Sequence, residues 1–202
     1  MIKYMKTCTK LLLLLVFVLN IQASKAAILP ILPGPVNQGE ITMADHNHFP
    51  ELKSKNLEGK EYLLPQDLET ELSILVLAYK RDQQKDVDAW LSGIKEKEID
   101  ICPVIRSYEV PVLKQFNTFI RFNIDNGMRY GIDDKSKREH VLSVYVDKES
   151  FNQALEIASE ETVHTLLVRQ SGEILWKESG TVDDEKLNEL KDFLKFLLKG
   201  KK

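Results

Sequence analysis

Two patterns of apolar residues alternate along most of the chain. Continuous apolar runs, which are typical of strands buried on both faces, are followed by segments whose apolar residues recur every three or four positions, which are typical of helices. The clearest run is SILVLAY at 73–79, and the clearest helical stripe is the leucine series within 182–199. Strands that are separated by helices favour parallel β-α-β units. The pattern therefore predicts an α/β domain.

The order of the expected elements is β-β-α-β-α-β-α-β-β-α, with a central mixed sheet flanked by helices. Ser171 and Gly172 form a turn that closes the last two strands into an antiparallel hairpin. The expected strands are 61–64, 73–79, 100–106, 141–146, 162–168 and 174–177, and the expected helices are 82–98, 111–124, 147–157 and 182–199.

The N-terminus has the three-part plan of a secretory signal peptide. Three lysines precede an apolar run at 11–19, and small residues follow at 23–26. The run is shorter than the about 20 residues that a membrane-spanning helix needs. We therefore expect a signal peptide at 1–26, a proline-rich arm at 27–47 and one domain at 48–202, in a periplasmic or secreted protein. An uncleaved N-terminal anchor is the alternative.

Charge and cysteine content narrow the possible functions. The whole chain has a net charge of −3, and cleavage after residue 26 would remove four lysines and no acidic residue, which leaves −7. This balance argues against a nucleic-acid-binding protein. Cleavage would also remove Cys8 and leave Cys102 as the one cysteine of the mature chain. The sequence shows no phosphate-binding loop or zinc-finger spacing, and we expect no cofactor.

Three segments together resemble the thioredoxin superfamily, in its peroxiredoxin and periplasmic thioredoxin-like branch. FPELKSKNLEGKEYLL at 49–64 is similar to that branch's N-terminal hairpin, and SILVLAYKRDQQKDVDAW at 73–90 to its first core strand and active-site helix. TVHTLLVRQSGEILWKESG at 162–180 is similar to its closing strands. The resemblance covers about residues 48–199 and implies a thioredoxin-like fold.

The sequence departs from this family at two chemically important positions. The family places a Cys-x-x-Cys motif at the start of the first core helix, where the helix N-terminus lowers a thiol pKa. The matching residues here, 80–85, read KRDQQK. The family's cis-proline corresponds to Val163 or His164. The resemblance therefore implies a thioredoxin-like scaffold without the usual thiol chemistry, so that enzymatic activity is uncertain and less expected than binding.

A second segment resembles another group of proteins. FIRFNIDNGMRYGIDDKSKREH at 119–140, together with ILWKESG at 174–180, resembles the mitochondrial ATP synthase assembly factors, which are thioredoxin-like chaperones without redox cysteines. This resemblance implies a role in binding or assembling another protein, although a mitochondrial location does not match a bacterial-type signal peptide.

The charged segment 125–140 is the expected binding surface. Gly127 and Gly131 flank a short run and suggest a shaped loop. Arginine can hold a carboxylate or a phosphate with two hydrogen bonds, so a protein partner is expected there. The alternative is a solvated loop with internal ion pairs, each worth about 0–1 kcal/mol. The candidate binding residues are Arg129, Tyr130, Arg138 and His140.

Cysteine and histidine supply the remaining candidates. Cys102 lies in an expected strand, where a buried and inert thiol is more usual than a reactive one. His46 and His48 could bind a metal but lack a visible third ligand. His164 could line a remnant pocket or be a satisfied strand residue. We therefore expect an exported non-catalytic protein, and the alternative is a thiol-dependent redox accessory or peroxiredoxin-like enzyme that uses Cys102.

Overall fold

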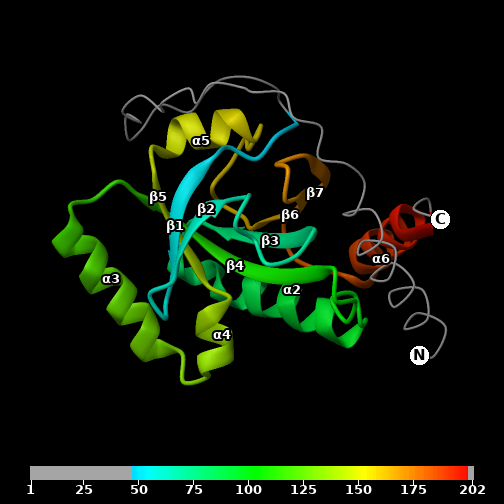
Figure 1. Cartoon of the computed structure of the whole chain (residues 1–202), viewed down its shortest axis with the longest axis horizontal. Helices are drawn as coiled ribbons and strands as arrows, with labels where there is room; N and C mark the ends of the chain where they lie inside the picture. The colour runs from blue at the N-terminus through cyan, green and yellow to red at the C-terminus, as the bar shows by residue number, and fades with distance from the viewer. Residues whose placement is uncertain (1–46, 200–202) are drawn as a thin grey trace, which may run out of the picture.

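A computed structural model describes residues 47–199, and its centre is one seven-stranded mixed sheet (Figure 1). The strands are β1 (Leu52–Asn56), β2 (Glu61–Leu64), β3 (Leu72–Ala78), β4 (Ile105–Lys114), β5 (Leu142–Val146), β6 (His164–Arg169) and β7 (Ile174–Ser179). The helices are η1 (Arg81–Gln83), α2 (Gln84–Glu96), α3 (Thr118–Gly131), α4 (Lys135–Glu139), α5 (Lys148–Ala154) and α6 (Asp184–Lys199). The expected signal peptide and nearly all of the arm lie outside the described residues, so they stay predictions.

The strands follow each other across the sheet in the order β2-β1-β5-β4-β3-β6-β7. Strands β3, β4 and β5 are parallel, and β6 and β7 form the expected antiparallel hairpin. Strand β6 runs antiparallel to β3, although a helix precedes it. The reason is that α5 spans only about 10 Å, too little to return the chain along the full length of a strand. The chain also has one more strand at its start, β1, than its apolar pattern indicated.

Both faces of the sheet are covered by apolar side chains. Alternate residues of β3 point to opposite sides, so Leu75 and Leu77 join one core while Ile74 and Val76 join the other. Helix α5 packs on the first face, and α2 and α6 pack on the second (Figure 1). Trp90 is fully buried in the second core.

Two predicted elements around β4 are wrong. The expected strand at 100–106 begins only at Ile105, because Cys102 and Pro103 form a turn in which the Cys102 carbonyl accepts a hydrogen bond from Ile105 N at 2.9 Å. The expected helix at 111–124 is strand up to Lys114. Val112, the β-branched residue of this stretch, is buried in the sheet. Helix α3 starts at Thr118 after Asn117, whose side chain accepts a hydrogen bond from Ile120 N.

The segment 125–140 is helical and is not the shaped loop that its glycines suggested. It comprises the second half of α3 and the short helix α4, which Asp134 caps through Ser136 N at 2.8 Å. Nothing lies within 4 Å of the place where a Cβ would stand on Gly127 or Gly131. Both are therefore solvent-facing helical glycines, each of which costs the helix only about 1 kcal/mol relative to alanine. None of the helices within residues 47–199 has the length and apolarity to cross a bilayer.

Candidate functional site

The turn between β3 and α2 contains residues 80–85. The family resemblance implies a Cys-x-x-Cys motif at this place, where the chain reads KRDQQK. The chain leaves β3 at Ala78, makes the single 3-10 turn η1 and enters α2 at Gln84. The side chain of Gln83 points back into this turn and is only 4% exposed. Its Oε1 accepts hydrogen bonds from Tyr79 N at 2.7 Å and from Lys80 N at 3.2 Å. An amide side chain therefore occupies the start of the helix and satisfies backbone groups there.

Gln83 also connects this turn to the segment that precedes β6. Its Nε2 donates to the carbonyl of Glu160 at 2.7 Å. A few residues later the buried pair Val163 and His164 stands at the position expected for a cis-proline. The cis peptide bond that the described residues contain joins Leu64 and Pro65, in another part of the fold. The β3–α2 turn and the segment before β6 are thus held together by amide hydrogen bonds.

His164 is a satisfied residue of β6. Its Nε2 lies 2.8 Å from the carbonyl oxygen of Ser159, and its ring meets the ring of Tyr79 edge to face at 6.1 Å. Burial lowers the pKa of His164, which keeps the imidazole neutral at physiological pH. These contacts favour the structural role for His164 over a pocket-lining role.

A polar cluster surrounds Tyr79 on the side of α5. The Tyr79 hydroxyl donates to Asn152 Oδ1 at 2.7 Å, and Asn152 Nδ2 donates to Glu160 Oε1 at 2.9 Å. Lys148 Nζ lies 2.9 Å from Glu160 Oε2 and 5.0 Å from the centre of the Tyr79 ring. Burial raises the pKa of Tyr79. Burial also raises the pKa of Glu160, but hydrogen bonds from Lys148 and Asn152 outweigh it and the net pKa is lowered.

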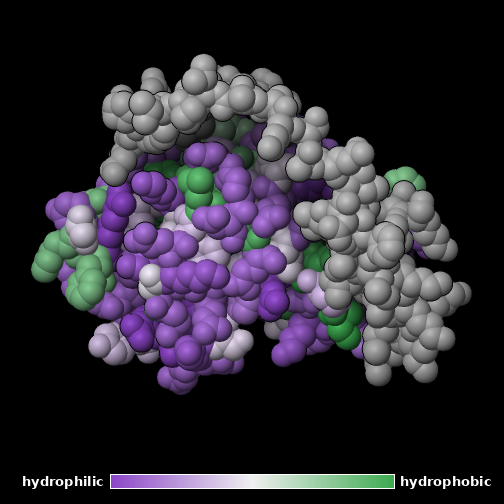
Figure 2. Space-filling view, in the orientation of Figure 1, coloured by the Kyte–Doolittle hydropathy of each residue, from purple (hydrophilic) through white to green (hydrophobic). Residues whose placement is uncertain are grey.

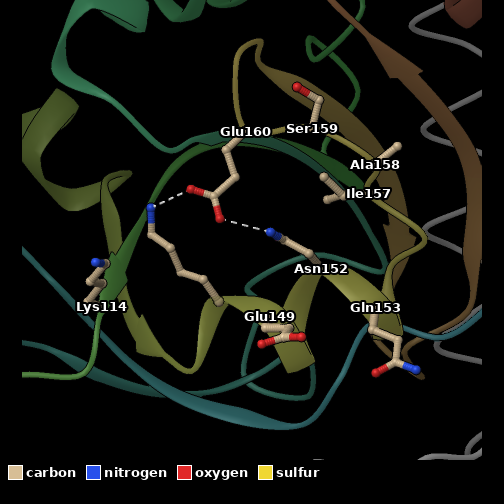
Figure 3. Close-up of a pocket in the computed structure, with 9 residues that line it drawn as sticks. Lys114, Glu149, Asn152, Gln153, Ile157, Ala158, Ser159 and Glu160 are labelled. Atoms are coloured by element: carbon tan, nitrogen blue, oxygen red, sulfur yellow. Dashed lines mark hydrogen bonds and ion pairs between the residues drawn. The ribbon is translucent and has the colours of Figure 1, made fainter.

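This cluster borders a pocket of about 850 Å³ (Figure 3). Glu160 and Asn152 point toward each other among the residues that line it, and Lys114 lies at the end of β4 (Figure 3). The pocket lies beyond the carboxyl ends of β4 and β5, which is where open α/β sheets bind ligands. Its lining offers lysines, carboxylates, amides and the hydroxyl of Ser159, and it contains no cysteine. The lining residues are Lys114, Lys148, Glu149, Asn152, Gln153, Ile157, Ala158, Ser159 and Glu160.

Two of the sequence-predicted site residues, Arg129 and Arg138, meet at one carboxylate. Arg138 Nε donates to Glu58 Oε1 at 2.6 Å, and Arg129 Nε lies 3.7 Å from the same oxygen. The hydrogen bond from Arg138 holds the pKa of Glu58 below its usual value, and the charge of Arg129 adds to the effect. Arg138 Nη1 also donates to the carbonyls of Ile132 and Asp133, at 2.7 and 2.9 Å. Arg138 therefore fastens the corner between α3 and α4, and its ion pair joins this corner to Glu58, which lies outside the segment 125–140.

The other two predicted residues, Tyr130 and His140, lie apart from that carboxylate. Tyr130 is 85% exposed on α3. His140 follows α4, where its Nδ1 lies 2.6 Å from the Ser136 carbonyl oxygen and its ring lies 5.6 Å from that of Tyr108. The structure thus brings Arg129 and Arg138 together, leaves Tyr130 accessible, and places His140 against the sheet.

The structure also gives the positions of two further candidates, Cys102 and His48. Cys102 is 6% exposed and packs in the core beside α2, in the turn that follows this helix rather than at its N-terminus. His48 forms an isolated bridge with Glu173, and His46 lies outside the described residues. Across residues 47–199, no group of three or more histidine, cysteine or acidic side chains is arranged to hold a metal.

Sequence reasoning missed the roles of Gln83 and of the Tyr79–Asn152–Glu160 cluster. These residues come from segments far apart in the chain, and none forms a local motif. The one available signal was that KRDQQK stands where relatives carry cysteines, which pointed to this turn but not to Gln83 in particular.

A mixed sheet with an N-terminal hairpin, a helix leaving the central strand and a closing β-hairpin followed by a helix defines a thioredoxin-like fold. No protein-family model matches the sequence, and no curated protein sequence matches it. Solved structures do match. BsSco, a member of the Sco family of cytochrome c oxidase assembly proteins, aligns at 10% identity with a TM-score of 0.50, over 77% of this chain and 96% of its own.

Other solved structures of this fold are similar. The pneumococcal exposed lipoprotein thioredoxin Etrx1 of Streptococcus pneumoniae aligns at 12% identity with a TM-score of 0.47, over 74% of this chain and 98% of its own. A putative protein disulfide isomerase of Bacteroides thetaiotaomicron aligns at 13% identity with a TM-score of 0.49, over 79% and 92%. The likeness to BsSco, at a TM-score of 0.50 and 10% identity, shows the fold alone.

Proposed function

We propose that this thioredoxin-like protein acts by binding another protein and does not exchange disulfides. The observation that carries the proposal is the Gln83 side chain, which fills the start of α2 and bonds both flanking segments. Disulfide exchange needs a thiolate at that helix N-terminus. The chain has an amide there, and its cysteines are Cys8 and Cys102.

The proposed role is assembly of another protein outside the cytoplasm. The N-terminal signal-like segment supports export, and the resemblance of 119–140 to ATP synthase assembly factors supports assembly. BsSco, whose fold is similar, belongs to a family of cytochrome c oxidase assembly proteins. We extend only the general kind of role to this chain, since the identity of the partner does not follow from the fold.

The proposed contact surface is the second half of α3, around Arg129 and Tyr130. Tyr130 is the more exposed of the two, and tyrosine is favoured at interfaces because it offers a large contact area and a polar tip. Arg138 holds the α3–α4 corner through its hydrogen bonds to the carbonyls of Ile132 and Asp133, and His140 contacts the Ser136 carbonyl of α4. They would position the surface without touching the partner.

A thiol assay separates this proposal from a redox accessory that uses Cys102. Insulin reduction would be measured for the wild-type protein and for Cys102→Ser, with a thioredoxin as positive control. We expect no turnover above background for either protein. Turnover that depends on Cys102 would refute the proposed function.

The contact surface is tested separately by site-specific photocrosslinking in the native cell. A photoreactive phenylalanine would replace Tyr130, and the matched control would carry it at Phe196, an exposed aromatic residue of α6. We expect one discrete crosslinked partner from position 130 and none from position 196. Identical patterns from the two positions would refute this surface.

A further inference from the structure

The beginning of α3 and the residues just before it carry an unusual number of exposed apolar side chains. Phe119 is 75% exposed and Phe122 is 62% exposed. Figure 2 shows a hydrophobic patch at the left end of the molecule, where Figure 1 shows the start of α3. We call this feature the α3 tip, and it consists of Phe116, Phe119, Ile120 and Phe122.

Helix α3 projects from the domain and does not contribute to its core. None of its residues is buried. Its attachment to the sheet is polar: Tyr145 donates a hydrogen bond to Asp125 Oδ1 at 2.7 Å, and the Arg121 guanidinium lies 4.9 Å from the centre of the Tyr145 ring. A groove of about 730 Å³ separates the helix from the face of β1 and β5. Core packing therefore does not explain why the tip is apolar.

The apolar side chains lie around the end of the helix rather than along one face. Successive residues of an α-helix are rotated by about 100°, so Phe122, Phe119 and Ile120 are spread over roughly 160° of its circumference. A flat protein surface laid along α3 would cover only part of this arc. Insertion of the helix end into an apolar medium would cover all of it, together with Phe116 in the preceding loop.

The charges around the tip are basic. Residues 110–124 read VPVLKQFNTFIRFNI and contain Lys114 and Arg121 but no aspartate or glutamate. The chain as a whole is acidic, so this is a local reversal of charge. Phenylalanines flanked by basic residues are the combination that inserts into the headgroup region of membranes with anionic lipids.

We propose that the α3 tip docks onto the surface of an anionic lipid bilayer. The phenylalanines enter the interface between headgroups and acyl chains, and the exposed Lys114 supplies positive charge for the lipid phosphates, while Arg121 remains on the Phe116 carbonyl and the Tyr145 ring. This goes beyond the proposed function, because it names a second binding surface with a different partner. Tyr130 lies about 16 Å along the helix from Phe119, so the protein-binding surface stays accessible while the tip is inserted.

Tryptophan quenching by brominated lipids tests this proposal on the full chain. Tryptophan would replace Phe122, and the matched control would carry it at Phe196, which is 73% exposed on α6. Unsubstituted protein gives the background from Trp90 and Trp176. With vesicles of brominated phosphatidylcholine and phosphatidylglycerol, we expect strong quenching at position 122 and none beyond background at position 196. Vesicles without the anionic lipid, or added salt, should weaken the quenching.

A second substitution shows whether the tip itself inserts. Phe119→Ser in the Phe122→Trp protein removes an exposed side chain, so the fold should be unaffected. Loss of one phenylalanine from the interface is expected to lower insertion of the tip roughly tenfold. Equal quenching at positions 122 and 196 would mean general adsorption, and no quenching at position 122 would mean that the tip does not enter the bilayer. Either result would overturn the proposal, and neither bears on the insulin assay.

Discussion

Replacement of Gln83 by alanine tests whether this residue holds the β3–α2 turn together. The substitution removes an acceptor for Tyr79 N and Lys80 N and a donor for the Glu160 carbonyl. The backbone N–H of Tyr79 is the most affected group, because this residue is 7% exposed and water cannot readily replace the lost partner. The other two groups lie nearer to solvent and can be partly hydrated.

The expected loss of stability follows from these three groups. A buried backbone group without a partner costs about 1–3 kcal/mol, and each hydrogen bond that water partly replaces contributes about 0.5–1.5 kcal/mol. Together they give a loss of about 2–6 kcal/mol in the free energy of unfolding. For a domain of this size, such a loss lowers the urea midpoint by roughly 1–3 M.

Urea denaturation followed by far-UV circular dichroism measures this effect. The matched control is Gln84→Ala, the same substitution at the next residue, whose exposed side chain makes longer hydrogen bonds, of 3.2 Å to Asp88 and of 3.3 Å to the buried carboxylate of Glu109. We expect the control to lose no more than about 1 kcal/mol. Equal losses for the two variants would show that Gln83 does not tie the turn to the segment before β6, and would remove the main support for the proposed function.

Two further predictions concern charged groups. Arg138→Ala should lower the free energy of unfolding by about 1.5–3 kcal/mol, because it removes the hydrogen bonds to the Ile132 and Asp133 carbonyls. In the same urea experiment Arg129→Ala, at a half-exposed site, should lower it by less than about 0.5 kcal/mol. Equal losses for the two variants would contradict the assignment of Arg138 to the α3–α4 corner. Burial raises the pKa of Glu109, so the folded state loses stability relative to the unfolded chain as pH rises above 4.5. Glu109→Gln should therefore stabilise the protein at neutral pH and have no effect below pH 4.5, and a stabilisation that is the same at both pH values would refute this.

Much of the fold could be predicted from the sequence because the spacing of apolar residues within a segment decides whether that segment is a strand or a helix. The continuous apolar run of β3 predicts a strand that is buried on both faces, and the leucine spacing of α6 predicts a helix with one buried face. The predicted helix at 111–124 is wrong at its start because Leu113, Phe116 and Ile120 have the spacing of one helical face, although Leu113 belongs to β4. Burial separates β4 from α3 in the structure, since Val110 and Val112 are fully buried while Phe119 is exposed. A helical spacing of apolar residues therefore does not reveal whether they face a core.

The candidate site is less accessible to sequence reasoning because its bonds join distant segments. Gln83 and Glu160 are 77 residues apart, and Tyr79 and Asn152 are 73 apart. None of these side chains is unusual for its own neighbourhood. The absence of cysteines at 80–85 shows that one chemistry is missing, but only the hydrogen bonds of Gln83 show what replaced it. The hydrogen bonds of Gln83 to Tyr79 N and to the Glu160 carbonyl connect this turn to the segment before β6, and a connection between segments so far apart in the chain leaves no local pattern from which it could be predicted.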